Sequence, residues 1–143
     1  MTPRRATATD LPLVQACITA AFAPFVAQIG RRPAPMDADH AGQIAAGQVW
    51  LVDGPGVMAC FAKPGAMELD ILAIAPEAQG RGLAAGLVAQ CEALARSAGL
   101  PVVELYTNAA MAGALRLYPR LGYAEIERRQ DQGFDRVFFR KTL

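Results

Sequence analysis

Two spacings of apolar residues divide the chain into helices and strands. From Leu11 to Phe22, apolar side chains recur every three or four positions, which is the period of one face of a helix. From Val57 to Ile74, they form short runs broken by proline and glycine, as in neighbouring strands. Along the whole chain, the pattern predicts helices over residues 11–23, 38–46, 82–97 and 109–120, and strands over residues 3–7, 48–52, 57–62, 67–75, 101–106, 123–128 and 134–141.

Residues at the ends of the predicted helices agree with this division. Thr9 or Asp10, Asp37 and Asn108 each precede a helix and carry a side-chain oxygen that can accept a bond from a free backbone N–H. Glycine follows the three later helices, as it commonly does where a helix ends. Residues 30–35, Gly-Arg-Arg-Pro-Ala-Pro, cannot continue a helix, so we expect a loop that is either a solvated connection or a wall of a substrate site.

The order of the elements predicts one mixed sheet. Short turns at residues 53–56 and 63–65 join the second, third and fourth strands, which favours an antiparallel meander. A helix joins the fourth strand to the fifth and so permits a parallel pair, and a turn at residues 130–133 makes the last two strands a hairpin. We therefore expect a single domain over residues 1–143, of the α/β class in its α+β form, with a mixed, mostly antiparallel sheet flanked by about four helices.

Composition and charge narrow the class of protein. Lys and Arg number 14 against 13 Asp and Glu, and no basic stripe stands out, so nucleic acid is not an expected partner. The three cysteines, Cys17, Cys60 and Cys91, have no paired spacing, which predicts reduced core thiols in a cytoplasmic protein. His40 is the single histidine, and we expect a surface or packing residue there.

The apolar N-terminal region raises the question of a targeting segment. Asp10, Pro12 and Gln15 interrupt any signal-peptide core, and the apolar residues around them keep helical spacing. We therefore expect an amphipathic helix of the domain. No stretch reads as apolar enough, for long enough, to span a membrane, so a membrane is not an expected partner.

Two carboxylates stand in the strand over residues 67–75. Strict alternation places Met67, Leu69 and Ile71 on one face of this strand and Glu68, Asp70, Leu72 and Ile74 on the other. Acidic residues are poor strand formers and are costly to bury unless they are paired or wet. The two acids therefore predict that their face opens on a cleft; a solvated outer face is the alternative.

A glycine-rich turn, Gln79-Gly80-Arg81-Gly82, follows this strand and opens a helix. A turn of this kind presents backbone N–H groups to a phosphate at a helix N-terminus. Residues 80–85 formally fit the dinucleotide pattern GxGxxA, with Glu104 as a ribose-binding acid, which leaves an NAD(P)-dependent oxidoreductase as a weaker hypothesis. The turn follows a meander, however, and too little chain remains for a doubly wound sheet.

Two motifs carry a resemblance to a known family. Gln79, Gly82 and Ala84 fit the pattern Gln-x-x-Gly-x-Gly/Ala, and residues 114–123, Ala-Leu-Arg-Leu-Tyr-Pro-Arg-Leu-Gly-Tyr, form a helix end followed by Leu-Gly-Tyr. In this order and at this separation, the motifs resemble those of the GNAT superfamily of acyl-CoA-dependent N-acyltransferases. The resemblance implies that the protein transfers acetyl from acetyl-CoA, as cosubstrate, to a primary amine by direct attack, without a metal.

The resemblance also implies roles for individual residues. The base that deprotonates the amine is Glu68 or Asp70, and Tyr118 protonates the departing thiolate or anchors its sulfur. A backbone N–H near Ile74 is placed to stabilise the oxyanion of the tetrahedral intermediate. The residues expected to contact the cosubstrate are Leu72, Ala73, Ile74, Gln79, Gly80, Arg81, Gly82, Leu83, Ala84 and Asn108.

One position departs from the family pattern, and the acceptor is open. Many family members carry an asparagine seven residues before the tyrosine, where this chain has Met111; Asn108 lies one turn earlier. The acceptor is a small-molecule or peptide amine. The guanidinium groups of Arg31, Arg32, Arg128 and Arg129 either indicate an acidic or carboxylate-bearing acceptor or belong to an ordinary solvated surface. A homodimer is possible. A non-catalytic module that binds or senses CoA is the alternative function.

Overall fold

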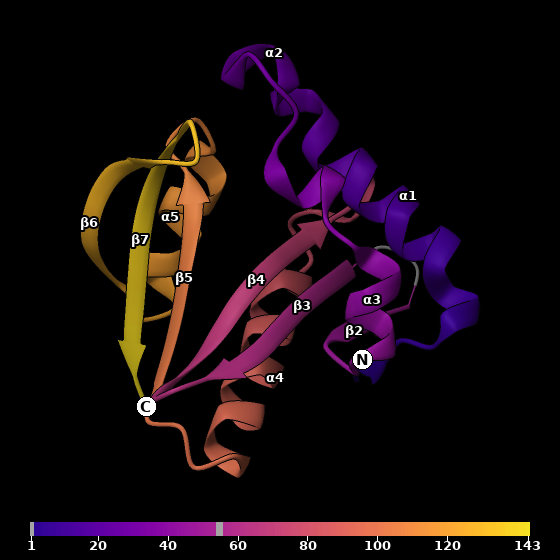
Figure 1. Ribbon diagram of the computed structural model, residues 1–143, viewed down its shortest axis with the longest axis vertical. Coiled ribbons are helices and arrows are strands. Elements are labelled where there is room, and N and C mark those ends of the chain that lie inside the picture. The colour runs from indigo at the N-terminus through magenta and orange to yellow at the C-terminus, as the bar shows by residue number, and fades with distance from the viewer. Residues whose placement is uncertain (1, 54–55) are drawn as a thin grey trace.

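The computed structural model describes residues 2–53 and 56–143, which form a seven-stranded sheet in the order β1-β2-β3-β4-β5-β7-β6 (Figure 1). The strands are β1 (Arg4–Arg5), β2 (Val49–Val52), β3 (Gly56–Lys63), β4 (Ala66–Ile74), β5 (Val102–Asn108), β6 (Ala124–Asp131) and β7 (Phe134–Thr142). Neighbouring strands are antiparallel except β4 and β5, which are parallel. The predicted meander, the parallel pair and the C-terminal hairpin are thus confirmed, and so is the mixed α/β fold.

Helices cover both faces of the sheet. They are α1 (Leu11–Phe22), α2 (Val26–Ile29), α3 (His40–Ala45), α4 (Leu83–Ser97) and α5 (Ala112–Arg120), with 3₁₀ turns at Ala8–Asp10, Ala23–Phe25, Ala34–Asp37 and Pro76–Ala78. In Figure 1, α4 lies behind β3 and β4, whereas α1 and α3 lie on the opposite face. The sheet therefore separates two apolar cores.

Each core is built from one face of a helix and one face of the sheet. In the core between α4 and the sheet, called the α4 core below, Leu87 and Cys91 are fully buried. In the core between α1 and the other face of the sheet, called the α1 core below, Val14 and Ile18 are buried together with Leu51 of β2. Burying a side chain of this size contributes about 1.5–3 kcal/mol. These contacts hold the helices at fixed positions on the sheet, and so fix the loops that follow β4 and β5.

A β-bulge interrupts β4 at Asp70. Ala59 of β3 lies opposite Ile71 and Cys60 lies opposite Leu69, so Asp70 has no opposite residue. The extra residue reverses the alternation of side chains: Leu69 packs in the α4 core, whereas Ile71 packs in the α1 core.

The predicted division of this strand into two faces is therefore wrong beyond Asp70. Ile71 lies on the face opposite Leu69, although strict alternation placed the two together. Leu72 and Ile74, expected beside the acids, pack against the α4 core instead. The physical reason is the bulge, which inserts one residue into the period of two.

The parallel strands β4 and β5 pair over only part of their length. Their register joins Met67, Glu68 and Leu69 to residues 103–105, yet β4 continues to Ile74 and β5 to Asn108. Figure 1 shows the two arrows diverging from their paired ends. Beyond Leu69 the facing backbone edges of β4 and β5 are not paired with each other.

Several helix ends differ from the predictions. Asp39, and not Asp37, caps α3, because its carboxylate accepts a bond of 3.0 Å from the N–H of Gly42. Asp37 instead ends the 3₁₀ turn Ala34–Asp37, which occupies part of the expected loop. At the start of the chain, Asp10 accepts a bond of 2.8 Å from the backbone N–H of Thr7 and so stabilises the 3₁₀ turn before α1.

The segment after β5 also differs. Asn108 is the last residue of β5, and its side chain accepts a bond of 2.9 Å from the N–H of Ala110, so it closes a turn and does not cap α5. Helix α5 begins only after Met111. The final hairpin turns at Gln132 and Gly133, both with positive φ, which makes its strands longer than predicted. Of the predicted turn 53–56, residues 54 and 55 lie outside the described residues.

The N-terminal helical segment is longer than predicted. Helix Ala8–Ile29 spans 22 residues and by length and composition could cross a membrane, so the expectation that no stretch qualifies is wrong. The difference arises because short helical segments extend the predicted helix at both ends. About 28% of an apolar stretch of 18 residues in this helix is buried inside the protein. Its buried residues Val14, Ile18 and Phe22 pack in the core between α1 and the sheet.

Candidate active site

The glycine turn before α4 presents a set of backbone donors. Gly80 and Gly82 have φ of 82° and 78°, a left-handed conformation that glycine adopts without strain. Gly82 directly precedes α4, and the carbonyl of Gly82 accepts from the N–H of Gly86. The N–H groups of residues 83–85 stand before that first helical bond and have no carbonyl partner in the helix. With the helix dipole, they form a site that favours an anion.

A cavity of about 380 Å³ adjoins this helix terminus. It lies within the size range of small-molecule sites. Its lining comes from α1 and its extension, the end of β4, the glycine turn, the start of α4 and helix α5: Ala21, Phe22, Phe25, Leu72, Ile74, Ala78, Gln79, Gly80, Gly82, Leu83, Ala84, Ala85, Met111, Gly113, Ala114, Leu117 and Tyr118. The cavity thus runs from the N-terminus of α4 to Tyr118.

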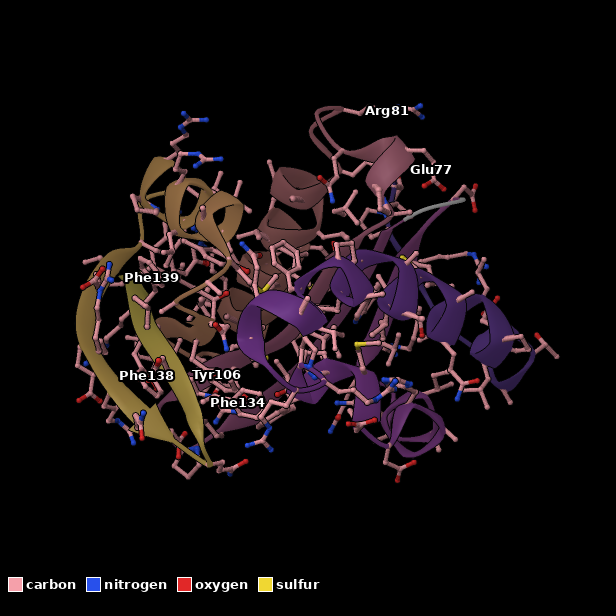
Figure 2. The ribbon with its side chains drawn as sticks, turned by 90° about the horizontal axis from the view of Figure 1, so that it is seen from above. Glu77, Arg81, Tyr106, Phe134, Phe138 and Phe139 are labelled. Carbon is pink, nitrogen blue, oxygen red and sulfur yellow. The ribbon has the colours of Figure 1, made fainter. Side chains whose placement is uncertain are left out.

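Two predicted residues of the turn have bonds within the protein. Gln79 donates its side-chain amide to the carbonyl of Ile74 at 3.2 Å, which ties the turn to the end of β4. Arg81 donates to the carbonyl of Glu77 at 3.2 Å, and Figure 2 shows both labelled residues at the outer edge of the turn. Arg81 and Ala73 are not among the residues that line the cavity; the Ala73 side chain is buried in the α1 core.

A second, smaller cavity of about 80 Å³ continues from the first. The two share Phe22, Leu72, Met111, Ala114 and Tyr118. The other walls of the small cavity come from the loop before α3 and from β4, β5 and β7: Pro33, Ala34, Pro35, Leu69, Asp70, Ile71, Tyr106, Thr107, Asn108, Phe134 and Arg136. Of the ten residues expected to contact the cosubstrate, Asn108 lies here and not in the larger cavity.

Asp70 is the carboxylate that lines the small cavity. Gln43 of α3 donates its amide to Asp70 Oδ2 at 2.8 Å. Burial raises the pKa of Asp70 above its ordinary value, although the Gln43 bond and the charge of Arg136 act in the opposite direction. A carboxyl group with a raised pKa is a stronger base when it is ionised, which suits a group that accepts a proton.

Glu68 has a different environment. Its carboxylate pairs with Lys63 at 3.1 Å, and Lys63 also pairs with Glu104 at 2.8 Å. Burial raises the pKa of Glu68 in spite of the Lys63 charge. Glu68 is not among the residues that line either of the two adjoining cavities.

Tyr118 lies where the two cavities meet. Its side chain is 6% exposed, and its ring packs against Tyr123 and Phe139 at centroid distances of 5.9 and 5.6 Å. Burial, with a smaller effect from Cys91, raises the pKa of Tyr118 well above its ordinary value. The phenol therefore keeps its proton at neutral pH and can donate it.

Residues 13–123 match the sequence profile described as "Acetyltransferase (GNAT) family". The chain belongs to the GNAT family. Among curated GNAT proteins, it is 37% identical over 89 residues to the mycothiol acetyltransferase of Cellulomonas flavigena. That match covers 61% of this chain but spans only 25% of the relative's length.

Solved structures show the same GNAT fold over the whole chain. The PaiA N-acetyltransferase of Thermoplasma acidophilum, in complex with coenzyme A, superposes with a TM-score of 0.81 at 14% identity, covering 99% of this chain and 98% of the other. The ribosomal-protein-alanine N-acetyltransferase of Brucella melitensis superposes with a TM-score of 0.76 at 21% identity and covers both chains fully. At these identities the likeness shows the fold.

Among the residues of the candidate site that were not found from the sequence are Gln43, Tyr106, Phe134 and Arg136. Arg136 is 4% exposed, pairs with Asp131 at 2.8 Å and stacks over the Tyr106 ring at 4.1 Å. Figure 2 shows Tyr106 and Phe134 together at one end of the sheet. A signal existed for Arg136, since a period of two places it on the same face as Phe134. None existed for Gln43, whose contact joins distant segments.

Two further points concern the role of His40 and whether a group of side chains could hold a metal ion. His40 is a packing residue, as expected: it is buried and bonds the carbonyl of Pro35 at 2.7 Å, which steadies one wall of the small cavity. Among residues 2–53 and 56–143, no three His, Cys, Asp or Glu side chains are grouped so that they could hold a metal ion.

Proposed function

We propose that this protein transfers the acetyl group of acetyl-CoA to a primary amine. The observation that supports this most is the meeting of two cavities at Tyr118, one with an anion site at its far end and one lined by Asp70. The GNAT family and the coenzyme A complex of the Thermoplasma relative support acetyl-CoA as the cosubstrate.

The larger cavity is the proposed site of acetyl-CoA. The pyrophosphate accepts bonds from the turn and first helical residues, 80–84, where free N–H groups and the helix dipole favour negative charge. The pantetheine arm lies along the edge of β4 over residues 72–74 and bonds the main chain as an added strand does, since this edge is not paired with β5. The thioester then lies near the residues that both cavities share.

Asp70 and Tyr118 supply the proton transfers in this proposal. An alkylammonium ion cannot attack, so the carboxylate of Asp70 removes one proton, directly or through water. The amine nitrogen then bonds to the thioester carbon, and the oxyanion that forms accepts a bond from a backbone N–H near Ile74. The C–S bond breaks and Tyr118 gives its proton to the CoA thiolate. The nitrogen of the new amide loses its second proton through water, which restores the Tyr118 phenol.

Two observations favour Asp70 over Glu68 as the base. Asp70 lines the cavity that also contains Tyr118, whereas Glu68 lines neither cavity. The carboxylate of Glu68 is also engaged in an ion pair with Lys63 at 3.1 Å. A base must lie within reach of the proton that it removes, and geometry decides before pKa.

Turnover of acetyl-CoA with a panel of primary amines, followed by thiol release, tests the function. We expect Asp70→Asn to lower kcat/KM at least about a hundredfold, the usual contribution of a general base, and Glu68→Gln to lower it less than about fivefold. Tight CoA binding without thiol release for any amine would refute the transferase and support a CoA-binding module. Equal losses in the two variants would refute the choice of Asp70.

A further inference from the structure

Six guanidinium groups lie on the loop before α3 and on the β6–β7 hairpin, and five of them have a carboxylate partner. The pairs are Arg32 with Asp37 at 2.9 Å, Arg128 with Glu125 at 2.9 Å, Arg129 with Glu127 at 3.1 Å, Arg136 with Asp131 at 2.8 Å, and Arg140 with Glu104 at 3.8 Å. Arg31 is the sixth. Within residues 2–53 and 56–143, no carboxylate pairs with its side chain.

Arg31 lies beside a residue that lines the small cavity. Its guanidinium stacks over the ring of Phe134 at 4.0 Å, and Phe134 itself lines the cavity. The side chain also donates to the carbonyl of Gln132 at 3.2 Å, which uses one of its five N–H groups. Just beyond Arg31 in the chain, Pro33 forms part of the cavity wall. The stack and the bond hold an exposed positive charge at a fixed place beside Phe134.

The cavity is too small for a whole acceptor. Its volume of about 80 Å³ is well below the usual range of about 300–1,000 Å³ for sites that enclose a small molecule. The amine-bearing end of an acceptor fits beside Asp70, and the rest of the molecule must extend beyond this cavity.

We infer that the acceptor carries a carboxylate near its amine, and that Arg31 binds this carboxylate beside the cavity. The inference rests on the proposed function. It pairs two opposite charges of the site with two opposite charges of the acceptor: Asp70 receives the ammonium group and Arg31 the carboxylate. A guanidinium suits this task because it binds a carboxylate through two parallel N–H bonds.

Arg31 acts on specificity and not on the chemical step. The carboxylate is bound equally in the ground state and the transition state, so loss of the contact raises KM and leaves kcat unchanged. Because Arg31 is exposed, added salt weakens the interaction. The carboxylate has two sources of the same chemistry, a free small amino acid or an acidic side chain in a peptide with a free N-terminus.

Two isosteric pairs of acceptors test the inference and separate these sources. One pair is γ-aminobutyrate and its amide; the other is an amidated tripeptide with glutamate or with glutamine at its second position. In at least one pair, we expect wild type to favour the acidic member by about fivefold in kcat/KM at low salt, as for a partly exposed charge pair. Arg31→Ala removes this preference through KM, Arg31→Lys keeps part of it, and Arg32→Ala, in the same loop but paired with Asp37, retains it.

Two results would overturn the inference. One is a wild type without preference in either pair; the other is an Arg31→Ala variant that weakens acidic and neutral acceptors equally, as a purely structural tie to Gln132 would. Turnover of the neutral amides in those cases would still uphold acetyl transfer. Calorimetric binding of the four compounds in the presence of CoA reports acid recognition without turnover, so failure of the inference and failure of the proposed function are seen separately.

Discussion

Two buried tyrosines that contact each other allow a pair of substitutions, one expected to change catalysis and the other to change stability. Tyr118 and Tyr123 pack edge to face at 5.9 Å. Tyr118 lines both cavities, whereas the hydroxyl of Tyr123 donates to the buried carboxylate of Glu92 at 2.8 Å. Replacing each by phenylalanine removes one oxygen and leaves the ring in place. The two substitutions are therefore matched in chemistry and differ in where the hydroxyl lies.

We expect Tyr118→Phe to lower kcat about a hundredfold. This is the lower end of the usual contribution of a general acid, because a thiol of pKa about 8.5 leaves more easily than an alcohol or an amine. The ring keeps its contacts with Tyr123 and Phe139, so the free energy of unfolding changes by less than about 0.5 kcal/mol.

Tyr123→Phe has the opposite expected profile. A hydrogen bond to a charged group contributes about 1.5–3 kcal/mol, and the lower value applies here because Lys141, at 3.2 Å, continues to neutralise Glu92. For a chain of this length, 1.5 kcal/mol corresponds to a decrease in Tm of roughly 5 °C. The hydroxyl is remote from the cavities, so kcat stays within about threefold of wild type.

Stopped-time assays of thiol release at saturating acetyl-CoA and amine give kcat, and urea denaturation gives the free energy of unfolding. Denaturation midpoints must be compared at equal m-values, so that a change in midpoint reports stability alone. A Tyr118→Phe variant with wild-type kcat would refute the role of general acid. So would an equal loss of kcat in both variants, because the loss would then follow from disturbed packing between the rings.

Two further substitutions test the base and the anion site. Gln43→Leu removes a bond that stabilises ionised Asp70, so the pKa of Asp70 rises further and the acid limb of the pH–rate profile moves to higher pH. The control, Gln130→Leu, removes an exposed amide-to-carboxylate bond in the hairpin and leaves the acid limb unmoved. An unshifted acid limb in Gln43→Leu would contradict the assignment of Asp70 as the base. Gly82→Ala places a side chain at a residue with positive φ and costs about 1–2 kcal/mol of stability. Gly99→Ala, at the other end of α4, has the same cost, but only Gly82→Ala weakens CoA binding in calorimetry. Equal CoA affinities of the two variants would refute the anion site.

Local patterns allowed most of the fold to be predicted from the sequence. The periods of two and 3.6 locate strands and helices because burial of one face is a property of each segment by itself. The bulge at Asp70 is a property of a pair of strands: it exists because Cys60 and Ala59 face Leu69 and Ile71, and nothing in the spacing of β4 alone reports it. The predicted cap of α3 was wrong for a related reason. Asp37 and Asp39 both precede α3, and only the folded structure shows that Asp39 is the cap.

In the candidate site, too, features that are local in the sequence could be predicted, and contacts between distant segments could not. The glycine turn is continuous in the sequence, and its two positive φ values are conformations that a motif can specify. The surroundings of Asp70 come from three distant segments, since Gln43 lies in α3 and Arg136 in β7. Sequence reasoning left Glu68 and Asp70 as alternative bases, since both stand in one strand. The proposed choice of Asp70 depends on contacts between distant or paired segments, among them the ion pair of Lys63 with Glu68.

The bulge and the separation of β4 from β5 occur at one point of the chain, and this links the two halves of the proposed mechanism. Pairing with β5 ends at Leu69, and the unpaired residue is the next one, Asp70. An extra residue increases the local twist of a strand and bends it. The residues that follow, 71–74, are not paired with β5, which leaves their backbone edge open to the proposed pantetheine arm, and Asp70 itself is the proposed base. The bulge thus places the proposed base and the proposed cosubstrate edge next to each other in the chain.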